Sequence, residues 1–292
     1  MQRKINNLRK IIKKKNLEIM KLKNQINTLT QNNNVKKAAL LIGINYYNTQ
    51  YELGGCINDV EKIKDLLINK YDFKEENIYM ICDKDSNSIH PTENNILEGF
   101  NWLINKNEQG FNKLWVHYSG HGSYSKDYNN DEEDGKDECI CTSDDKFIDD
   151  DIINKKLIQK INENTTLICF MDCCHSGTIL DLKYKYISGN KNEIQNNIKN
   201  TLANVILISG CKDYQTSDDA YYDGEWSGAM TKFFLETIEN DNYNITCYNL
   251  LRKMRNSLKK NNHTQIPQMT CSRKLNAVTI FTSTNNNDDS YI

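Results

Sequence analysis

Long hydrophobic runs are missing from this sequence of 292 residues. The longest uninterrupted apolar stretch, Ala38–Ile44, is far too short to cross a bilayer. The first ten residues, MQRKINNLRK, lack the apolar centre of a secretory signal peptide. We therefore expect a cytoplasmic protein with no membrane partner. An apolar content of 38% is enough for one sizeable α/β core.

Zinc-finger and disulfide patterns are also missing, although the chain has ten cysteines. Several of these cysteines lie inside strand-like apolar runs, and a cytoplasmic protein keeps its thiols reduced. Cys139 and Cys141 form a close pair, but no second Cys/His pair follows at zinc-finger spacing. A cysteine with a special role is therefore expected to be catalytic or a metal ligand.

The net charge is small, −2, but it is unevenly distributed. Residues 1–34 hold nine Lys or Arg and one acid, so this segment carries +8 and the remainder −10. Apolar residues of the segment follow a heptad that Lys15 interrupts: Ile5, Leu8, Ile12, Ile19, Leu22, Ile26 and Leu29. The heptad over residues 5–29 predicts either a self-associating parallel coiled coil or one amphipathic helix lying on the next domain as a pro-segment. Because no aromatic residues are interleaved with the basic ones, nucleic-acid binding is not favoured.

From Val35 onward, short apolar runs alternate with amphipathic segments. The expected strands are Ala38–Ile44, Asn77–Ile81, Lys113–Tyr118, Leu167–Met171, Val205–Ser209 and Ala277–Phe281. The expected helices are Asp59–Lys70, Thr92–Asn105, Asp149–Ile161, Gly228–Ile238 and Thr246–Lys260. This alternation predicts an α/β fold in which helices cover both faces of a mainly parallel sheet. Two polar stretches, 127–138 and 182–204, break the alternation and are expected to be surface loops.

Two of the expected strands end in residues that can carry out chemistry. One leads into SGHG (119–122) and the other into DCCHSG (172–177). Active sites in parallel sheets lie beyond the carboxyl ends of the strands, so both motifs should open onto one crevice. His121 can activate a cysteine nucleophile, and the backbone N–H groups of Gly122 and Cys174 can stabilise an oxyanion. Each motif alone is also explained as a tight turn, but the two together favour catalysis.

These motifs, YSGHG (118–122) and DCCHSG (172–177), resemble the catalytic motifs of metacaspases, a family within the caspase-like cysteine peptidases. The resemblance extends from Lys37 to about Phe281 through ALLIGINYY (39–47), GGCINDV (54–60), HSGTILDL (175–182), LISGCKDYQTSD (207–218), GAMTKFF (228–234) and QIPQM (265–269). It implies a caspase-like fold with His121 as general base. It also identifies Cys174 as the nucleophile and leaves Cys173 as a packed side chain, a choice that spacing alone does not make.

The order of the motifs resembles that of type I metacaspases. It implies a large-subunit-like region (35–182), a linker (183–203), a small-subunit-like region (204–283) and a disordered tail (284–292). The basic heptad segment stands where many of them have a Pro-rich or zinc-finger prodomain. Lys183 and Lys185, at the start of the linker, are the expected sites of self-cleavage.

The resemblance also assigns a pocket for the residue before the scissile bond (P1). Its expected lining is Cys56, Asp59, Ser119 and Asp172. Two carboxylates in one enclosed pocket require a cationic guest, which predicts Arg or Lys at this position. As an alternative, Asp59 caps the following helix and Asp172 only orients a turn.

A calcium site is implied by the same resemblance, with Asp137, Asp149, Asp150 and Asp181 as ligands. Hard carboxylate oxygens in this number suit Ca²⁺, which is expected to activate the enzyme without taking part in catalysis. No EF-hand loop is present. An acidic helix N-terminus also explains residues 149–151, and the choice among these three aspartates is open by one position.

The sequence thus predicts a calcium-dependent cysteine endopeptidase that cleaves protein or peptide substrates after Arg or Lys through a Cys174/His121 dyad and an acyl-enzyme. The alternative is a catalytically silent caspase-like scaffold that oligomerises through its N-terminal helix. The intact set of His121, Asp172 and Cys174 argues against the scaffold, since a decayed site would be expected to lose one of them.

Overall fold

The computed structural model describes residues 15, 19, 21, 35–126, 135–174, 176–188, 191–194, 201–210, 219–222 and 224–274. The chain divides into two units, residues 1–36 and 37–292. In the first unit, Lys15, Ile19 and Lys21 are helical. The rest of the heptad prediction, the strand expected at 277–281 and the tail at 284–292 lie outside the described residues.

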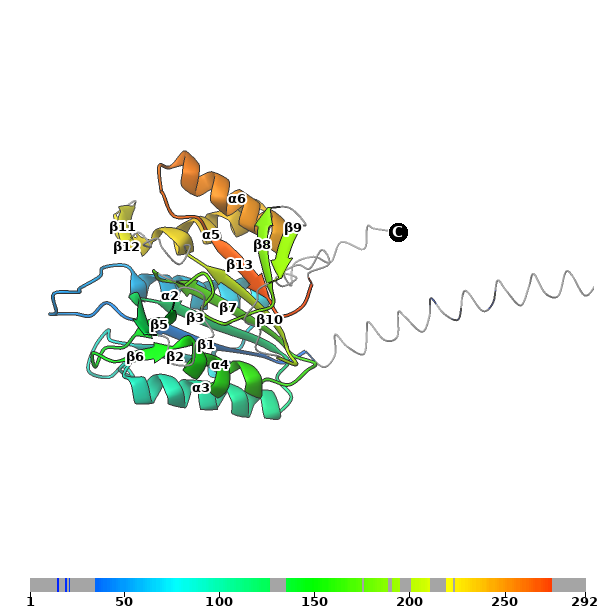
Figure 1. Ribbon diagram of the computed structural model, residues 1–292, viewed down its shortest axis with the longest axis horizontal. Coiled ribbons are helices and arrows are strands. Elements are labelled where there is room, and N and C mark those ends of the chain that lie inside the picture. Colours follow the sequence, from blue (N-terminus) through cyan, green and yellow to red (C-terminus); the bar gives the residue numbers. More distant parts are fainter. Residues whose placement is uncertain are drawn as a thin grey trace, which may run out of the picture. The chain divides into compact units, whose positions relative to one another are not determined.

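An eight-stranded sheet forms the centre of the second unit (Figure 1). In spatial order its strands are β2 (Ile78–Cys82), β1 (Lys37–Gly43), β3 (Lys113–Ser119), β7 (Thr166–Asp172), β10 (Asn204–Ser209), β13 (Gln268–Cys271), β8 (Tyr184–Ser188) and β9 (Lys191–Ile194). The first five strands are parallel, and β13, β8 and β9 pair antiparallel. The predicted α/β fold with a mainly parallel sheet is confirmed.

Helices cover both faces of this sheet. The helices α2 (Cys56–Tyr71), α5 (Ala229–Asn240) and α6 (Cys247–Lys260) pack on one face, and α3 (Glu93–Glu108) and α4 (Asp150–Lys156) on the other. The strands divide their side chains by the period of two: Ala39 and Leu41 join the α2 face, whereas Leu40 and Ile42 join the α3 face. This alternation fixes which face each residue at a strand end will occupy.

A buried aromatic group fills the α2 face. The Phe170 ring lies 6.2 Å from Trp115 and 4.4 Å from Phe234 of α5. His117 stacks on Phe170 at 5.2 Å and is fully buried. Because burial lowers the pKa of His117 to about 3, this imidazole is neutral at physiological pH. His117 is therefore a core histidine, as the sequence predicted.

Two small antiparallel sheets were not expected from the sequence. One contains β4 (Gly122–Lys126), β5 (Lys136–Cys141) and β6 (Phe147–Asp149), and the other contains β11 (Asp219–Tyr222) and β12 (Glu225–Gly228). The helix expected over 149–161 is shorter: α4 ends at Lys156, and a 3-10 turn, η2 (Ile158–Lys160), follows after Leu157 leaves helical geometry. Among the described residues, no helix is long and apolar enough to cross a membrane.

The polar stretch 182–204 is not the surface loop that was predicted, because it contains β8 and β9. Tyr186 is 4% exposed and belongs to the core on the α2 face, and Tyr184 packs against the same core. β8 pairs with β13 on one side and with β9 on the other. The two tyrosines give β8 a buried side, so the polar residues between them do not make the segment a loop.

Candidate active site

The site forms where β3 and β7 end. Their register aligns Ser119 with Asp172, so the SGHG and DCC segments leave the sheet side by side. The N–H of Gly120 donates to the carbonyl oxygen of Asp172 at 3.4 Å. The two motifs that lie 53 positions apart in sequence are therefore adjacent at one edge of the sheet.

Gly122 meets the backbone of Cys174 at very short range. A Cβ atom at Gly122 would lie 1.9 Å from the Cys174 carbonyl oxygen and 3.2 Å from its nitrogen. Any larger residue would push the two segments apart, which explains the glycine after His121. The backbone groups of Gly122 and Cys174, both predicted to stabilise an oxyanion, thus lie next to each other.

The His121 imidazole has a defined tautomer. Its Nε2 lies 2.8 Å from the carbonyl oxygen of Tyr51, and the ring packs 4.8 Å from that of Tyr46. A carbonyl oxygen only accepts hydrogen bonds, so Nε2 carries the hydrogen. In the neutral ring Nδ1 is then the basic nitrogen, which is the form that a general base requires.

The backbone of His121 is fixed as firmly as its ring. Its N–H donates to the Tyr46 hydroxyl at 3.0 Å, and its carbonyl oxygen accepts from the Tyr118 hydroxyl at 2.7 Å and from the N–H of Cys141 at 3.0 Å. Burial raises the pKa of both tyrosines well above the usual value, so both remain neutral donors. Asp83 in turn holds the Tyr46 backbone by accepting its N–H at 2.7 Å.

The two adjacent cysteines have different surroundings. Cys173 is 0% exposed and packs in the core on the α3 face, whereas Cys174 is partly exposed. A third thiol, Cys141, lies close to Cys174. Burial, and then the neighbouring Cys174, raises the pKa of Cys141 to about 11, which keeps Cys141 protonated. Cys141 is also partly exposed, so exposure separates only the adjacent pair: Cys173 is buried, and Cys174 is the one of the two that a substrate can reach.

On the α2 face, the Asp59 carboxylate is wholly enclosed. It accepts hydrogen bonds from the Ser119 hydroxyl at 2.9 Å, the Ser227 hydroxyl at 2.6 Å and the N–H of Gly228 at 3.0 Å. Helix α2 begins without a side-chain cap, so Asp59 is not its cap. Cys56, the first residue of α2, is buried beside it.

The second carboxylate, Asp172, lies next to Asp59. Its Oδ2 accepts from the N–H and the hydroxyl of Thr231, at 2.9 and 2.8 Å. A Cβ atom at Gly228 would lie 2.4 Å from Asp172 Oδ2 and 2.8 Å from Asp59 Oδ2. Burial, followed by the charge of Asp172, raises the pKa of Asp59 well above its usual value. The four residues assigned to the pocket by resemblance thus include two adjacent buried acids.

A separate acidic cluster lies near the N-terminus of α4. Carboxylate oxygens of Asp150, Asp151 and Asp181 all lie within 4.8 Å of one another. Burial raises the pKa of Asp150 to about 9, and the negative charges of Asp181, Glu138 and Asp137 contribute to this rise. Asp137 and Glu138 belong to β5. The buried Oδ2 of Asp150 has no hydrogen-bond partner within the described part of the chain. Asp150 therefore offers an oxygen that a cation could bind.

Asp149 has a different position from the other aspartates predicted to bind calcium. Its Oδ1 accepts the N–H of Ile152 at 2.7 Å and so caps α4. One oxygen of Asp149 is therefore used to cap the helix. The group of three neighbouring carboxylates contains Asp151 and not Asp149. Asp181, with a left-handed φ of 51°, joins this group from the segment that follows Cys174.

Comparison with known proteins identifies the family. The sequence model of the metacaspase, peptidase C14 domain matches residues 36–183. Metacaspase-1 of Schizosaccharomyces pombe is 35% identical and is aligned over 82% of this chain and 68% of its own length. The chain belongs to the metacaspase family.

Other relatives agree with this assignment. Metacaspase-1 of Eremothecium gossypii is 34% identical over 82% of this chain, which spans 64% of that protein. Metacaspase-1 of Plasmodium falciparum is 44% identical in an alignment that covers 62% of this chain and 31% of that protein. The fold resembles a Geobacter sulfurreducens protein (TM-score 0.62, 22% identity, 85% and 99% of the two chains) and caspase-1 of Spodoptera frugiperda (TM-score 0.53, 9% identity, 86% and 92%).

Several residues of this metacaspase site were not singled out by sequence reasoning. They are Tyr46 and Tyr51, which position His121, and Cys141, which neighbours Cys174. The lysines expected to be self-cleaved are half-buried: Lys183 precedes β8, and Lys185 lies inside it opposite Thr270 of β13. Cleavage at Lys185 would require β8 to leave the sheet.

Proposed function

We propose that this metacaspase is a cysteine endopeptidase with Cys174 as nucleophile and His121 as general base. The observation that carries the proposal is the defined His121 tautomer beside the close approach of Gly122 to Cys174. His121 Nδ1 takes the Cys174 proton, and the thiolate attacks the peptide carbonyl. In this proposal the N–H groups of Gly122 and Cys174, whose backbones lie next to each other, receive the oxyanion.

The second half of the reaction uses the same groups in reverse order. When the tetrahedral intermediate collapses, the C–N bond breaks and His121 gives its proton to the departing amine, leaving a thioester on Cys174. Water then attacks the thioester carbonyl while His121 accepts one of its protons. The C–S bond breaks, the acid product leaves, and His121 returns the proton to the Cys174 sulfur. The hydrogen bond from Nε2 to the Tyr51 carbonyl oxygen also stabilises the imidazolium formed in each step.

The residue before the scissile bond is Arg or Lys in this proposal. Asp59 and Asp172 are both buried, and no Lys or Arg among the described residues forms an ion pair with Asp59. A guest guanidinium or ammonium group would offset the negative charge of Asp172, which together with burial raises the pKa of Asp59. Arg has the further advantage of bidentate pairing with a carboxylate.

Calcium dependence is the second part of the proposal. Asp137, Asp150, Asp151 and Asp181 supply hard oxygen donors, and the buried Asp150 oxygen without a partner fits a bound cation. The ion would supply charge neutralisation, not bond cleavage. Since Asp181 follows the nucleophile by seven positions, holding it would order the segment between them and align Cys174.

One experiment tests both parts. The purified protein is incubated with fluorogenic peptides that end in Arg, Lys or Asp, in millimolar calcium and in chelator. We expect cleavage of the Arg and Lys peptides only in calcium, and reversible loss in chelator. Cleavage after Asp would contradict the pocket assignment, and equal activity in calcium and chelator would contradict the calcium switch. Intact-mass analysis of the same samples tests self-cleavage after Lys183 or Lys185.

A further inference from the structure

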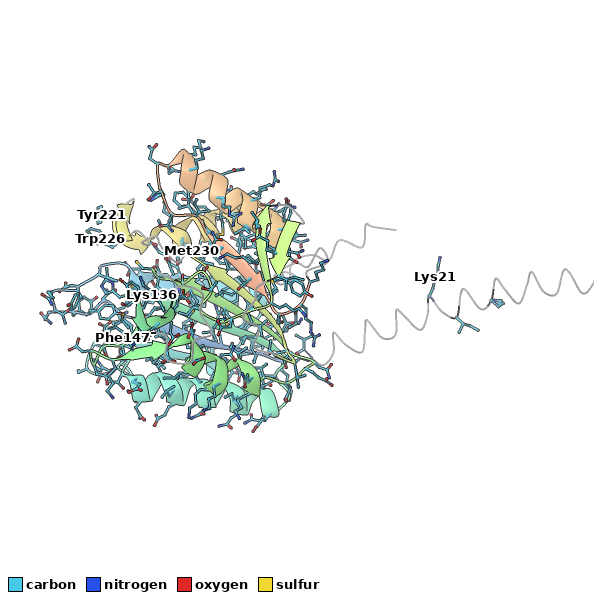
Figure 2. All side chains as sticks on the ribbon, viewed as in Figure 1. Lys21, Lys136, Phe147, Tyr221, Trp226 and Met230 are labelled. Carbon is cyan, nitrogen blue, oxygen red and sulfur yellow. The ribbon has the colours of Figure 1, made fainter. Side chains whose placement is uncertain are left out.

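A cleft of about 610 Å³ opens beside His121. Its walls come from three elements: the segment after β1 supplies Tyr46 and Tyr51, the β3–β4 turn supplies His121, and β5 with the start of β6 supplies Cys141 and Phe147. Figure 2 shows Phe147 on the opposite side of this end of the sheet from Tyr221 and Trp226 of the β11–β12 hairpin. Neither of the two buried carboxylates is among the residues that line the cleft.

The strand period places the cleft and the carboxylates on opposite faces. Ser119 and Asp172 point to the α2 face and contact Asp59 and Thr231 there. Tyr118 and Cys173, one position away from each, belong to the α3 face together with Tyr46, which also lines the cleft. Cys174 follows Asp172 by two positions, and it neighbours Gly122 and Cys141, which both line the cleft. A substrate that fills both sides must therefore pass Cys174.

The chemistry of the reaction gives the direction of that substrate. The side chain before the scissile bond enters the carboxylate pocket. The departing amine must reach His121, because His121 protonates it. The residue attached to that amine therefore continues past His121, and the cleft that His121 lines is the cavity it meets.

Aromatic side chains give this cleft its chemical character. Tyr51 is 56% exposed and Phe147 is 54% exposed, and both face the cleft with Tyr46. Lys146 also lines it, but its ammonium pairs with Glu93 at 2.8 Å. An acidic guest would compete with Glu93 for this cation, whereas an apolar guest would cover exposed aromatic surface.

We propose that this cleft binds the side chain of the residue directly after the scissile bond and selects large apolar or aromatic residues there. The proposal rests on the proposed peptidase function and extends it to the other half of the substrate. Tyr51 connects the cleft to catalysis, because its ring lies 6.2 Å from the His121 ring while its carbonyl oxygen holds His121 Nε2. A guest in the cleft therefore packs against the residue that orients the general base.

Internally quenched peptides test this assignment. All carry Arg before the scissile bond and differ only in the next residue, which is Phe, Leu, Gly or Asp. We expect kcat/KM for Phe and Leu to exceed that for Gly and Asp by about 10-fold, the scale of filling an apolar subsite. Phe147→Ala should reduce this ratio to about 3-fold or less. Tyr124→Ala is the matched control, because Tyr124 of neighbouring β4 is 50% exposed but does not line the cleft.

Acyl transfer provides a second measurement. Phenylalaninamide or glycinamide is added during turnover, so that the amine nitrogen attacks the thioester, Cys174 is released and the amine proton passes to His121. We expect phenylalaninamide to capture more acyl-enzyme than glycinamide does, and Phe147→Ala to remove that difference. Equal rates for all four peptides, a preference for Gly or Asp, or the same response in Phe147→Ala and Tyr124→Ala would overturn the assignment.

A second peptide series separates this inference from the function it rests on. Here Phe is fixed after the scissile bond, and the residue before it is Arg, Lys or Asp. A strict requirement for Arg or Lys combined with a flat profile after the bond would overturn the cleft assignment alone. No cleavage of any peptide in calcium, or cleavage after Asp, would instead overturn the proposed function.

Discussion

Two regions of this metacaspase bury carboxylates, and they do so in different ways. Asp59 accepts hydrogen bonds from three donor groups, and Asp172 accepts two hydrogen bonds, both from Thr231. In the acidic cluster, one Asp150 oxygen accepts a backbone N–H and the other has no partner among the described residues. Donors fix the direction of a carboxylate, whereas an oxygen without donors keeps its lone pairs for a metal. In the proposed function, the donor-rich region is the substrate pocket and the acidic cluster is the ion site.

The largest expected effect is on peptidase activity and concerns the proposed nucleophile. The tests of both regions measure this activity. Cys174→Ala removes the thiol proposed as nucleophile, so kcat/KM with an Arg peptide should fall by at least ~10⁴-fold. Cys173→Ala changes only a packed side chain and should keep most of the activity. Steady-state kinetics on both variants decide the assignment, and an equal loss in the two would refute it.

The next effect tests the donor-rich region. Asp172→Ala removes one partner of an enclosed charge pair and should lower kcat/KM for Arg peptides by about 30-fold, or ~2 kcal/mol. The calcium concentration for half-maximal activity should not change. Asp65→Ala, at an exposed position on α2, is the control and should behave like the wild type. A parallel shift in calcium requirement would mean that the two regions are not separate.

The converse substitution tests the acidic cluster. Asp181→Ala removes one oxygen donor, so half-maximal activity should require at least ~10-fold more calcium. The ratio of Arg to Asp cleavage should stay at its wild-type value, since the pocket is untouched. Calcium titrations of the wild type, Asp181→Ala and Asp65→Ala provide the measurement. Unchanged calcium dependence in Asp181→Ala would contradict the assignment of this cluster as the calcium site.

The last effect, which is the smallest when taken per pH unit, is a pH dependence of stability in chelator. Asp150 has a pKa of about 9 in the folded chain and about 4 when unfolded. The folded state holds this proton more tightly, so the free energy of unfolding should fall as pH rises from about 4 to about 9. The slope is on the order of 1 kcal/mol per pH unit. Asp150→Asn should flatten it in urea unfolding between pH 5 and 8. Identical slopes for the two proteins would show that Asp150 is not the buried acid described.

The sequence predicted the strands that carry the site because each is a continuous apolar run. β3 and β7 both start and end within one residue of their predicted bounds, and β1 starts and ends one residue earlier than predicted. The sequence did not predict β8, because its alternating tyrosines lie among the lysines of a polar stretch. Residues of the acidic cluster were assigned by resemblance, and only the structure separates the helix cap Asp149 from the group that includes Asp151.

The contacts that position His121 were beyond sequence reasoning for a different reason. The Tyr51 carbonyl oxygen is a backbone atom, so no side-chain pattern marks its role. The hydroxyl groups of Tyr46 and Tyr118 reach His121 and Cys141 only after separate segments come together. Through-space contacts of this kind depend on the folded arrangement and not on local periodicity.

The strand order has a consequence for a chain cut at Lys183. Such a cut would divide the sheet into two contiguous halves of four strands, β2-β1-β3-β7 and β10-β13-β8-β9, joined along the seam between β7 and β10. Cys174 and Asp59 would remain on one half, while Ser227 and Thr231, which hold the two carboxylates, would belong to the other. A cleaved molecule would therefore keep the complete proposed substrate pocket only while β7 and β10 stay paired. Neither half contains all the residues of the pocket by itself.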